Sequence, residues 1–217
     1  MIALRPDIPD DQPLRVLCLG AHCDDIEIGC GGTLRRLIER PGGAICRYEV
    51  LSSTPERRAE AEAATEALLD GALERTVAVA TFREGYFPFV GDRIKDRFEE
   101  IKGEFTPDIV LTHQRHDRHQ DHRVLSDLAW NTFRDHLVLE YEIPKWDGDM
   151  GVPNLFVPLE PAHVDAKLGV VLERFPSQRA KPWFDEETFR GLMRLRGMEC
   201  NAPSRYAEAF YCRKAVL

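Results

Sequence analysis

Two short segments of the chain concentrate imidazole and carboxylate side chains. The first runs from His22 to Glu27 and the second from His113 to His122, and together they hold five of the 7 histidines. Histidine nitrogens and carboxylate oxygens are the ligands of zinc and similar divalent ions, and three protein ligands plus one water form a hydrolytic site. The sequence therefore predicts a metal-dependent hydrolase.

The spacing within each segment supports a shared site. His119 and His122 are three residues apart, as are His22 and Asp25, and on a helix residues with this separation lie on one face. A free carboxylate beside a metal-bound water, such as that of Asp24, can accept its proton. These residues predict a His/Asp/His metal site with spare carboxylates next to it.

Both segments directly follow a predicted strand, so their position depends on a sheet. Strands are predicted at 15–21, 44–52, 76–82, 107–113, 137–143 and 207–212, and helices at 31–40, 54–69, 92–105, 119–135, 161–174 and 185–199. This alternation predicts one α/β domain over residues 1–217, with a Rossmann-like, mostly parallel sheet and helices on both faces. In open parallel sheets ligands bind outside the carboxyl ends of the strands, so both segments can face one site.

Composition excludes several classes of protein. The 217 residues are 43% hydrophobic and 30% charged, which excludes a disordered or fibrous chain. The net charge of −8 disfavours nucleic acid as a partner, and the apolar runs fall short of the roughly 18–20 residues that span a membrane. Residues 1–7 lack the order of a signal peptide, and six cysteines without a CxxC pair are typical of reduced thiols. We expect a soluble cytoplasmic protein.

The two segments also match a known family. Residues 22–27 (HCDDIE) and 29–33 (GCGGT) resemble the AHPDD-x-E…GG-T signature of the LmbE-like (PIG-L) zinc-dependent de-N-acetylases. Residues 119–122 (HQDH) are similar to that family's H-x-D-H motif. The resemblance extends to the predicted helix with Arg57, Glu60 and Ala61 and to residues 206–210 (YAEAF). The departure is Cys23, where the family usually has proline; we interpret it as a loop change that leaves the chemistry intact.

The resemblance implies a role for each matching residue. It implies one Zn²⁺ or another divalent transition metal per chain, bound by His22, Asp25 and His122. Asp24 would be the general base, His119 would stabilise the oxyanion, and Asp121 would orient a histidine. The implied substrate is an N-acetylated amino-sugar conjugate of the N-acetylglucosamine type.

Other residues have weaker signals. Candidates for substrate contact are Arg57, Arg58, Arg115, His116, Arg118 and Trp146, the last in a long loop at 145–153. We expect Asp117 to cap the helix that follows it, and His113 is as easily structural as functional. The glycines at 29–32 indicate close helix–sheet packing rather than a phosphate loop, and Glu208 is expected to support the site from a strand.

Two alternatives remain open. The chain can be a metal-dependent hydrolase of another amide or of a phosphoester, which commonly needs two metals. It can also be a sugar-binding or metal-binding module without activity. The sequence leaves open the sugar conjugate, the metal, the proton donor for the leaving amine and whether the chain forms a homo-oligomer.

Overall fold

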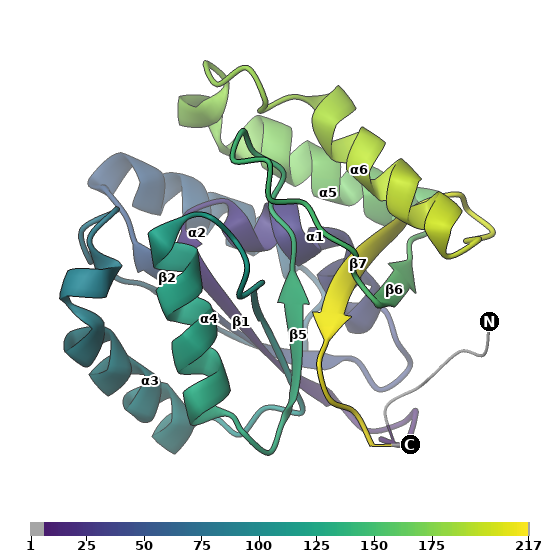
Figure 1. The fold of residues 1–217 in the computed structure, drawn as a ribbon. Helices are drawn as coiled ribbons and strands as arrows, with labels where there is room; N and C mark the ends of the chain where they lie inside the picture. Colours follow the sequence, from purple (N-terminus) through teal and green to yellow (C-terminus); the bar gives the residue numbers. More distant parts are fainter. Residues whose placement is uncertain (1–6, 217) are drawn as a thin grey trace.

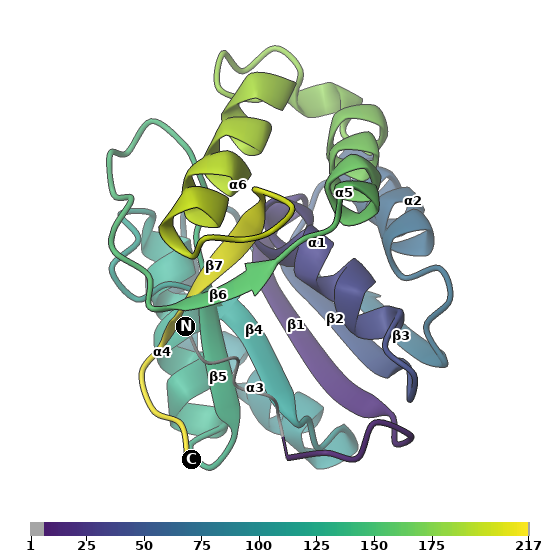
Figure 2. The same ribbon diagram turned by 90° about the vertical axis from the view of Figure 1, so that its right-hand side faces the viewer.

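The computed structural model describes residues 7–216 and contains one seven-stranded sheet. Its strand order is β3-β2-β1-β4-β5-β7-β6 (Figure 2). The strands are β1 Leu14–His22, β2 Ala44–Ser52, β3 Glu74–Val79, β4 Ile109–His113, β5 Leu137–Tyr141, β6 Leu155–Pro158 and β7 Ala207–Cys212. Strands β1 to β5 pair in parallel, whereas β7 is antiparallel to β5 and β6. The predicted α/β fold is confirmed; the segment considered for a signal peptide lies almost wholly outside the described residues.

Helices cover both faces of this sheet (Figures 1 and 2). They are α1 Asp25–Ile38, α2 Pro55–Leu68, α3 Gly91–Glu104, α4 Gln120–Thr132, α5 Pro161–Arg174 and α6 Glu186–Glu199. One apolar core joins α1, α2, α5 and α6 to the sheet, and a second joins α3 and α4 to the opposite face. Because apolar side chains of β1 face both cores, the strand is a nearly continuous apolar run. None of the helices in residues 7–216 is long and apolar enough to cross a membrane.

The sheet has a switch point between its two central strands. Strands β1 and β4 are neighbours, yet β1 leads into α1 on one face and β4 leads into α4 on the other. The connecting segments therefore diverge at the carboxyl ends of these strands, which is where open α/β sheets bind ligands. This topology brings the two chemically rich segments to one edge.

Three local predictions need correction. Helix α1 begins at Asp25 instead of residue 31, and its backbone departs from helical geometry at Cys30 (φ −146°, ψ 17°). The glycines of this segment have poor helix propensity, so partners elsewhere in the fold decide its course. Helix α4 ends at Thr132, and β6 is a short strand that no sequence pattern indicated.

Candidate metal centre

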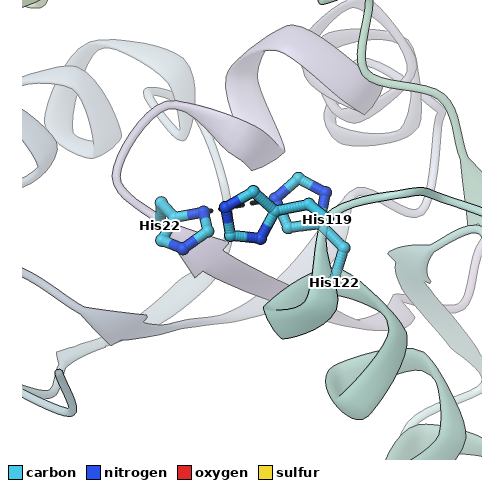
Figure 3. A group of neighbouring side chains, drawn as sticks. All are labelled: His22, His119 and His122. Atoms are coloured by element: carbon cyan, nitrogen blue, oxygen red, sulfur yellow. Dashed lines mark hydrogen bonds between the residues drawn. The ribbon is translucent and has the colours of Figure 1, made fainter. Parts of the chain in front are cut away.

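Three side-chain atoms from the two segments converge at the switch point. Nδ1 of His22 lies 3.2 Å from Nε2 of His122 (Figure 3). Oδ2 of Asp25 lies 3.4 Å from the first nitrogen and 3.5 Å from the second. A tetrahedral zinc ion with bonds of ~2.0–2.1 Å separates its ligand atoms by roughly 3.3–3.4 Å. The spacing and the donor types of this triangle therefore fit one such ion.

A carboxylate from the second segment fixes the ring of His22. Nε2 of His22 lies 3.1 Å from Oδ2 of Asp121. Asp121 also accepts hydrogen bonds from the backbone N–H groups of Gly85 (2.6 Å) and Phe87 (3.1 Å). Because Asp121 accepts a hydrogen bond from the Nε2–H group, Nδ1 of His22 is the nitrogen that faces the triangle. The position of Asp121 suits the orienting role that the resemblance implies.

A different carboxylate fixes the ring of His122. Nδ1 of His122 lies 2.9 Å from Oδ2 of Asp117, whose Oδ1 accepts the backbone N–H of His119 at 2.8 Å. The prediction that Asp117 caps α4 is wrong, because His119 is the N-cap and its Nδ1 accepts the N–H of Asp121 (3.3 Å). Asp117 is instead buried and holds His122 with its Nε2 toward the triangle.

Lys145 completes this arrangement and had no signal in the sequence. Its Nζ lies 3.0 Å from Oδ2 of Asp117 and 2.8 Å from Oδ2 of Asp149. Burial alone would raise the pKa of Asp117, but His122 and Lys145 outweigh it and hold that pKa well below its usual range. The loop between β5 and β6 is thereby tied to the second segment.

Asp25 is held by the end of β1 and lies against His113 of β4. Its Oδ2 accepts the backbone N–H of His22 at 2.7 Å and lies 3.2 Å from Nε2 of His113. Burial would raise the pKa of Asp25, but His122 and His113 overcome this and hold it well below the usual value. The carboxylate therefore stays ionised, as a metal ligand must.

His113 lies inside the site, which the sequence had left undecided. It is fully buried, its ring stacks on His122 with centroids 3.8 Å apart, and its Nε2 accepts the N–H of Ala21 at 3.1 Å. Ligand atoms of Asp25, His113 and His122 also lie within 4.8 Å of one another. Because the Nε2 lone pair of His113 is already used by Ala21, His22 is the better third ligand. The sequence signal that could have indicated His113 is its position at the last residue of β4.

Asp24 has the properties of a general base. Its backbone adopts φ 101°, a left-handed conformation that costs a non-glycine residue about 1–3 kcal/mol. Burial raises the pKa of Asp24 to about 7, although Arg57, whose Nη2 lies 3.0 Å from Oδ1, opposes the shift. A carboxylate with a pKa near neutrality can both accept and release a proton at physiological pH.

His119 presents an N–H group beside the triangle. Its ring centroid lies 4.7 Å from those of His22 and His122 (Figure 3). Burial, together with the nearby His22, lowers the pKa of His119, so the ring is neutral. Since its Nδ1 accepts the N–H of Asp121, we assign the ring proton to Nε2. A neutral donor of this kind suits developing negative charge.

Two of the arginines predicted to contact substrate bind side chains of the protein itself. Arg57 bonds Ser177 (3.2 Å) in addition to Asp24. Nε of Arg115 lies 3.1 Å from Oε1 of Glu140 on β5.

The other predicted contact residues lie nearer the surface. Arg58 donates a hydrogen bond to the carbonyl of Val79 with 39% of its side chain exposed. His116 and Arg118 are exposed residues of the second segment. Trp146 is 71% exposed and makes an edge contact with Trp183 at 6.4 Å between centroids.

The chain is similar to known proteins in two comparisons. A family model described as GlcNAc-PI de-N-acetylase, PIG-L, matches residues 17–133, more than half of the chain. No protein of curated function matches by sequence. The conserved protein TT1542 from Thermus thermophilus has 25% identity and a TM-score of 0.75, covering 94% of this chain and 96% of that one.

Two further solved structures share the fold. The N,N'-diacetylchitobiose deacetylase from Pyrococcus horikoshii has 21% identity and a TM-score of 0.65, covering 90% of this chain and 82% of that one. The 4-carboxy-2-hydroxymuconate hydratase GalB from Pseudomonas putida has 18% identity and a TM-score of 0.67, with 94% and 98% covered. The fold thus occurs in proteins with different named reactions.

Proposed function

Because the chain belongs to the GlcNAc-PI de-N-acetylase (PIG-L) family, we propose that it removes the acetyl group from an N-acetylated amino-sugar conjugate with the help of one bound Zn²⁺. The observation that supports this most directly is the triangle of His22, Asp25 and His122, with separations of 3.2, 3.4 and 3.5 Å. These three residues would hold the ion. When bound, zinc acidifies a coordinated water and polarises the amide carbonyl.

The residues around the triangle supply the proton transfer and the charge stabilisation. Asp24 takes the proton from the attacking water, since its pKa of about 7 matches a general base at neutral pH. His119 donates its Nε2–H to the carbonyl oxygen as negative charge develops there. A donor in this role contributes about 10²–10³-fold to the rate. Asp121 and Asp117 keep the two ligand histidines in the required orientation.

The sugar class is proposed from the family and from an exposed aromatic residue in the loop that Lys145 ties to the site. The family model names a GlcNAc substrate, and the similar archaeal enzyme acts on diacetylchitobiose. Trp146 offers an apolar ring face beside Lys145, which contacts the site through Asp117. Aromatic faces of this kind suit the apolar side of a sugar ring. We therefore propose a small N-acetylated sugar conjugate as the substrate.

Acetate release tests this proposal. Protein stripped of metal and reloaded with one equivalent of Zn²⁺ is incubated with N-acetylglucosamine, diacetylchitobiose, an inositol-linked and a nucleotide-linked N-acetylglucosamine. We expect acetate from at least one conjugate, none after chelation, and none from Asp24→Asn that still binds zinc. The matched control is Asp127→Asn, an exposed acid on α4, which should keep wild-type turnover.

The alternatives give different results in the same experiment. A phosphoester hydrolase would release no acetate and would hold two metal ions per chain. A binding module would hold one ion and a sugar without turnover. Either result would reject the deacetylase proposal.

A further inference from the structure

Helix α1 is interrupted by a buried ion pair from two other elements. In a regular α-helix the N–H of residue 32 would donate to the carbonyl of residue 28. Here the N–H of Gly32 donates to Oε1 of Glu208 at 2.9 Å, and the carbonyl of Ile28 accepts from Nζ of Lys167 at 2.5 Å. The same Nζ lies 2.6 Å from Oε1 of Glu208. The ion pair thus bridges the two backbone groups at the point where Cys30 leaves helical geometry.

Glu208 acts on the second half of α1 as a capping residue acts on a helix start. Its Oε2 accepts the N–H of Thr33 at 2.7 Å, in addition to the bond from Gly32. Two free backbone N–H groups and the positive end of a helix dipole favour a carboxylate at this place. Glu208 lies on β7, in the YAEAF segment near the end of the chain, so the break is imposed from a distant part of the sequence.

The break sets the course of the first half of α1, which contains Asp25. This half lies close against β5: a Cβ on Gly29 would lie 2.2 Å from Cδ2 of Tyr141. The hydroxyl of Tyr141 in turn donates to the carbonyl of Leu19 on β1 (2.7 Å) and lies 3.3 Å from Nε2 of His113. Through Tyr141, the half-helix that begins at Asp25 is therefore connected to β1 and β4, the strands that present His22 and His113.

A gain in folding stability does not explain why Lys167 and Glu208 form a buried ion pair. The side chains of Lys167 and Glu208 are 4% and 3% exposed, and burying two charges costs about as much as their attraction returns. Apolar residues of similar size would serve a core at least as well. What apolar residues cannot do is bond the free N–H of Gly32 and the carbonyl of Ile28.

We propose that Lys167 and Glu208 are positioning residues, which hold α1 broken at Cys30 so that Oδ2 of Asp25 reaches His22 and His122. The pair touches neither substrate nor metal. It acts through the backbone of α1. The inference rests on the metal site of the proposed function but not on the reaction that the site performs.

Metal affinity separates positioning from simple stabilisation. The test variant is Lys167→Met/Glu208→Leu, and the readouts are Zn²⁺ affinity, by competition with a chromophoric chelator, and thermal unfolding of the metal-free protein. We expect zinc affinity to fall about 10–100-fold, the range seen when a residue that orients a metal ligand is lost. The unfolding midpoint should change little, because without the pair the N–H of Gly32 can bond the carbonyl of Ile28 as in a regular helix, and the charges are exchanged for apolar volume.

A second buried pair provides the matched control. Arg47 and Glu49 on β2 form an ion pair at 2.7 Å with 6% and 1% exposure, on the face covered by α3. Arg47→Met/Glu49→Leu should leave zinc affinity unchanged. If both double variants weaken zinc equally, loss of any buried pair loosens the site and the positioning role is wrong.

Two further measurements keep the inference falsifiable. If the double variant does not fold, Glu208→Gln retains one acceptor oxygen, and we expect about tenfold weaker zinc binding from a folded protein; unchanged affinity overturns the inference. A crystal structure of either variant in which Asp25 still lies within hydrogen-bond distance of His22 and His122 overturns it whether or not zinc binds. Wild-type protein that binds zinc but releases no acetate would reject the deacetylase proposal and leave this inference standing.

Discussion

His22 and Asp121, 99 residues apart in the chain, meet with Nε2 and Oδ2 at 3.1 Å. Burial alone would lower the pKa of His22, but the hydrogen bonds to Asp121 and Asp25 outweigh it and raise that pKa to about 10. Burial and His113 lower the pKa of His122 to about 3. In the metal-free protein a proton therefore lies between Nδ1 of His22 and Nε2 of His122, in the position that a cation would take.

Zinc binding should displace that proton. We expect release of about one proton per zinc bound, and an apparent dissociation constant that weakens about tenfold for each pH unit below the pKa of His22, about 10. Calorimetric titration in two buffers of different ionisation enthalpy measures the proton release. Asp121→Asn lowers the pKa of His22 and should reduce the release. Zinc uptake without proton release would show that the pKa of His22 is not raised.

The same shift predicts how stability depends on pH. A histidine whose pKa is higher in the folded state stabilises the protein fully below its unfolded pKa, and this contribution is lost as pH rises through the folded pKa. For His22 the window runs from about 6.5 to about 10. We expect the free energy of unfolding of the metal-free protein to fall across this window by a few kcal/mol. Urea unfolding at several pH values measures the fall, which His22→Gln should reduce.

The two neighbouring histidines of the second segment should separate by function. We expect His122→Ala to weaken zinc binding far more than His119→Ala, because only His122 has a nitrogen in the triangle. His119→Ala should instead lower kcat about 10²–10³-fold with zinc retained. Metal content and kcat, measured on the same samples, check this. Equal loss of zinc in both variants would mean that His119 is also a ligand, since its ring lies with those of His22 and His122 in a group that could hold one ion.

Arg57 should control the acid limb of the pH–rate profile. Its guanidinium, 3.0 Å from Asp24, opposes the effect of burial on the pKa of that carboxyl. Arg57→Gln should therefore raise the pKa of Asp24 further and move the acid limb of kcat/KM to higher pH. Arg58→Gln, one residue along and 39% exposed, is the control and should leave the limb in place. A shift in neither variant would contradict the general-base role of Asp24.

Lys145 should matter for stability, since it is the counter-ion of two buried acids. Lys145→Met leaves Asp117 and Asp149 without their cation, and breaking a buried pair costs about 3–5 kcal/mol. Unfolding in urea measures this loss. Lys145→Arg should restore part of it, and Lys102→Met on α3, which lies on the surface, should have little effect. If Lys145→Met lowers the free energy of unfolding as little as Lys102→Met does, water replaces the ammonium group of Lys145 beside the two acids.

Trp146 should affect substrate binding without affecting the fold. Because 71% of the residue is exposed, Trp146→Ala removes little buried area. We therefore expect the free energy of unfolding to change by less than about 1 kcal/mol. If the ring stacks on a sugar, KM should rise several-fold with kcat nearly unchanged. Trp146→Phe should retain most of the binding. Unchanged KM in the alanine variant would remove Trp146 from the substrate site.

The sequence by itself determined the fold class and the convergence of the two segments that contain His22, Asp25 and His122. Apolar runs alternating with helical patterns predict a parallel sheet, and the carboxyl ends of parallel strands share one edge, so two segments that each follow a strand must lie near one another. The spacing of His119 and His122 predicts a common helix face. These inferences need only local periodicity and one rule of topology.

The tertiary structure alone decided which partners the groups that hold the site in place would bond. Glu208 bonds Gly32 across 176 positions of sequence, Lys145 reaches Asp117 across 28, and His113 enters the site through Ala21. A single sequence shows the period of its own segments but not which distant polar group meets a free N–H or carboxylate. That choice is made when burial removes water, because each buried polar group must then find a partner within the fold.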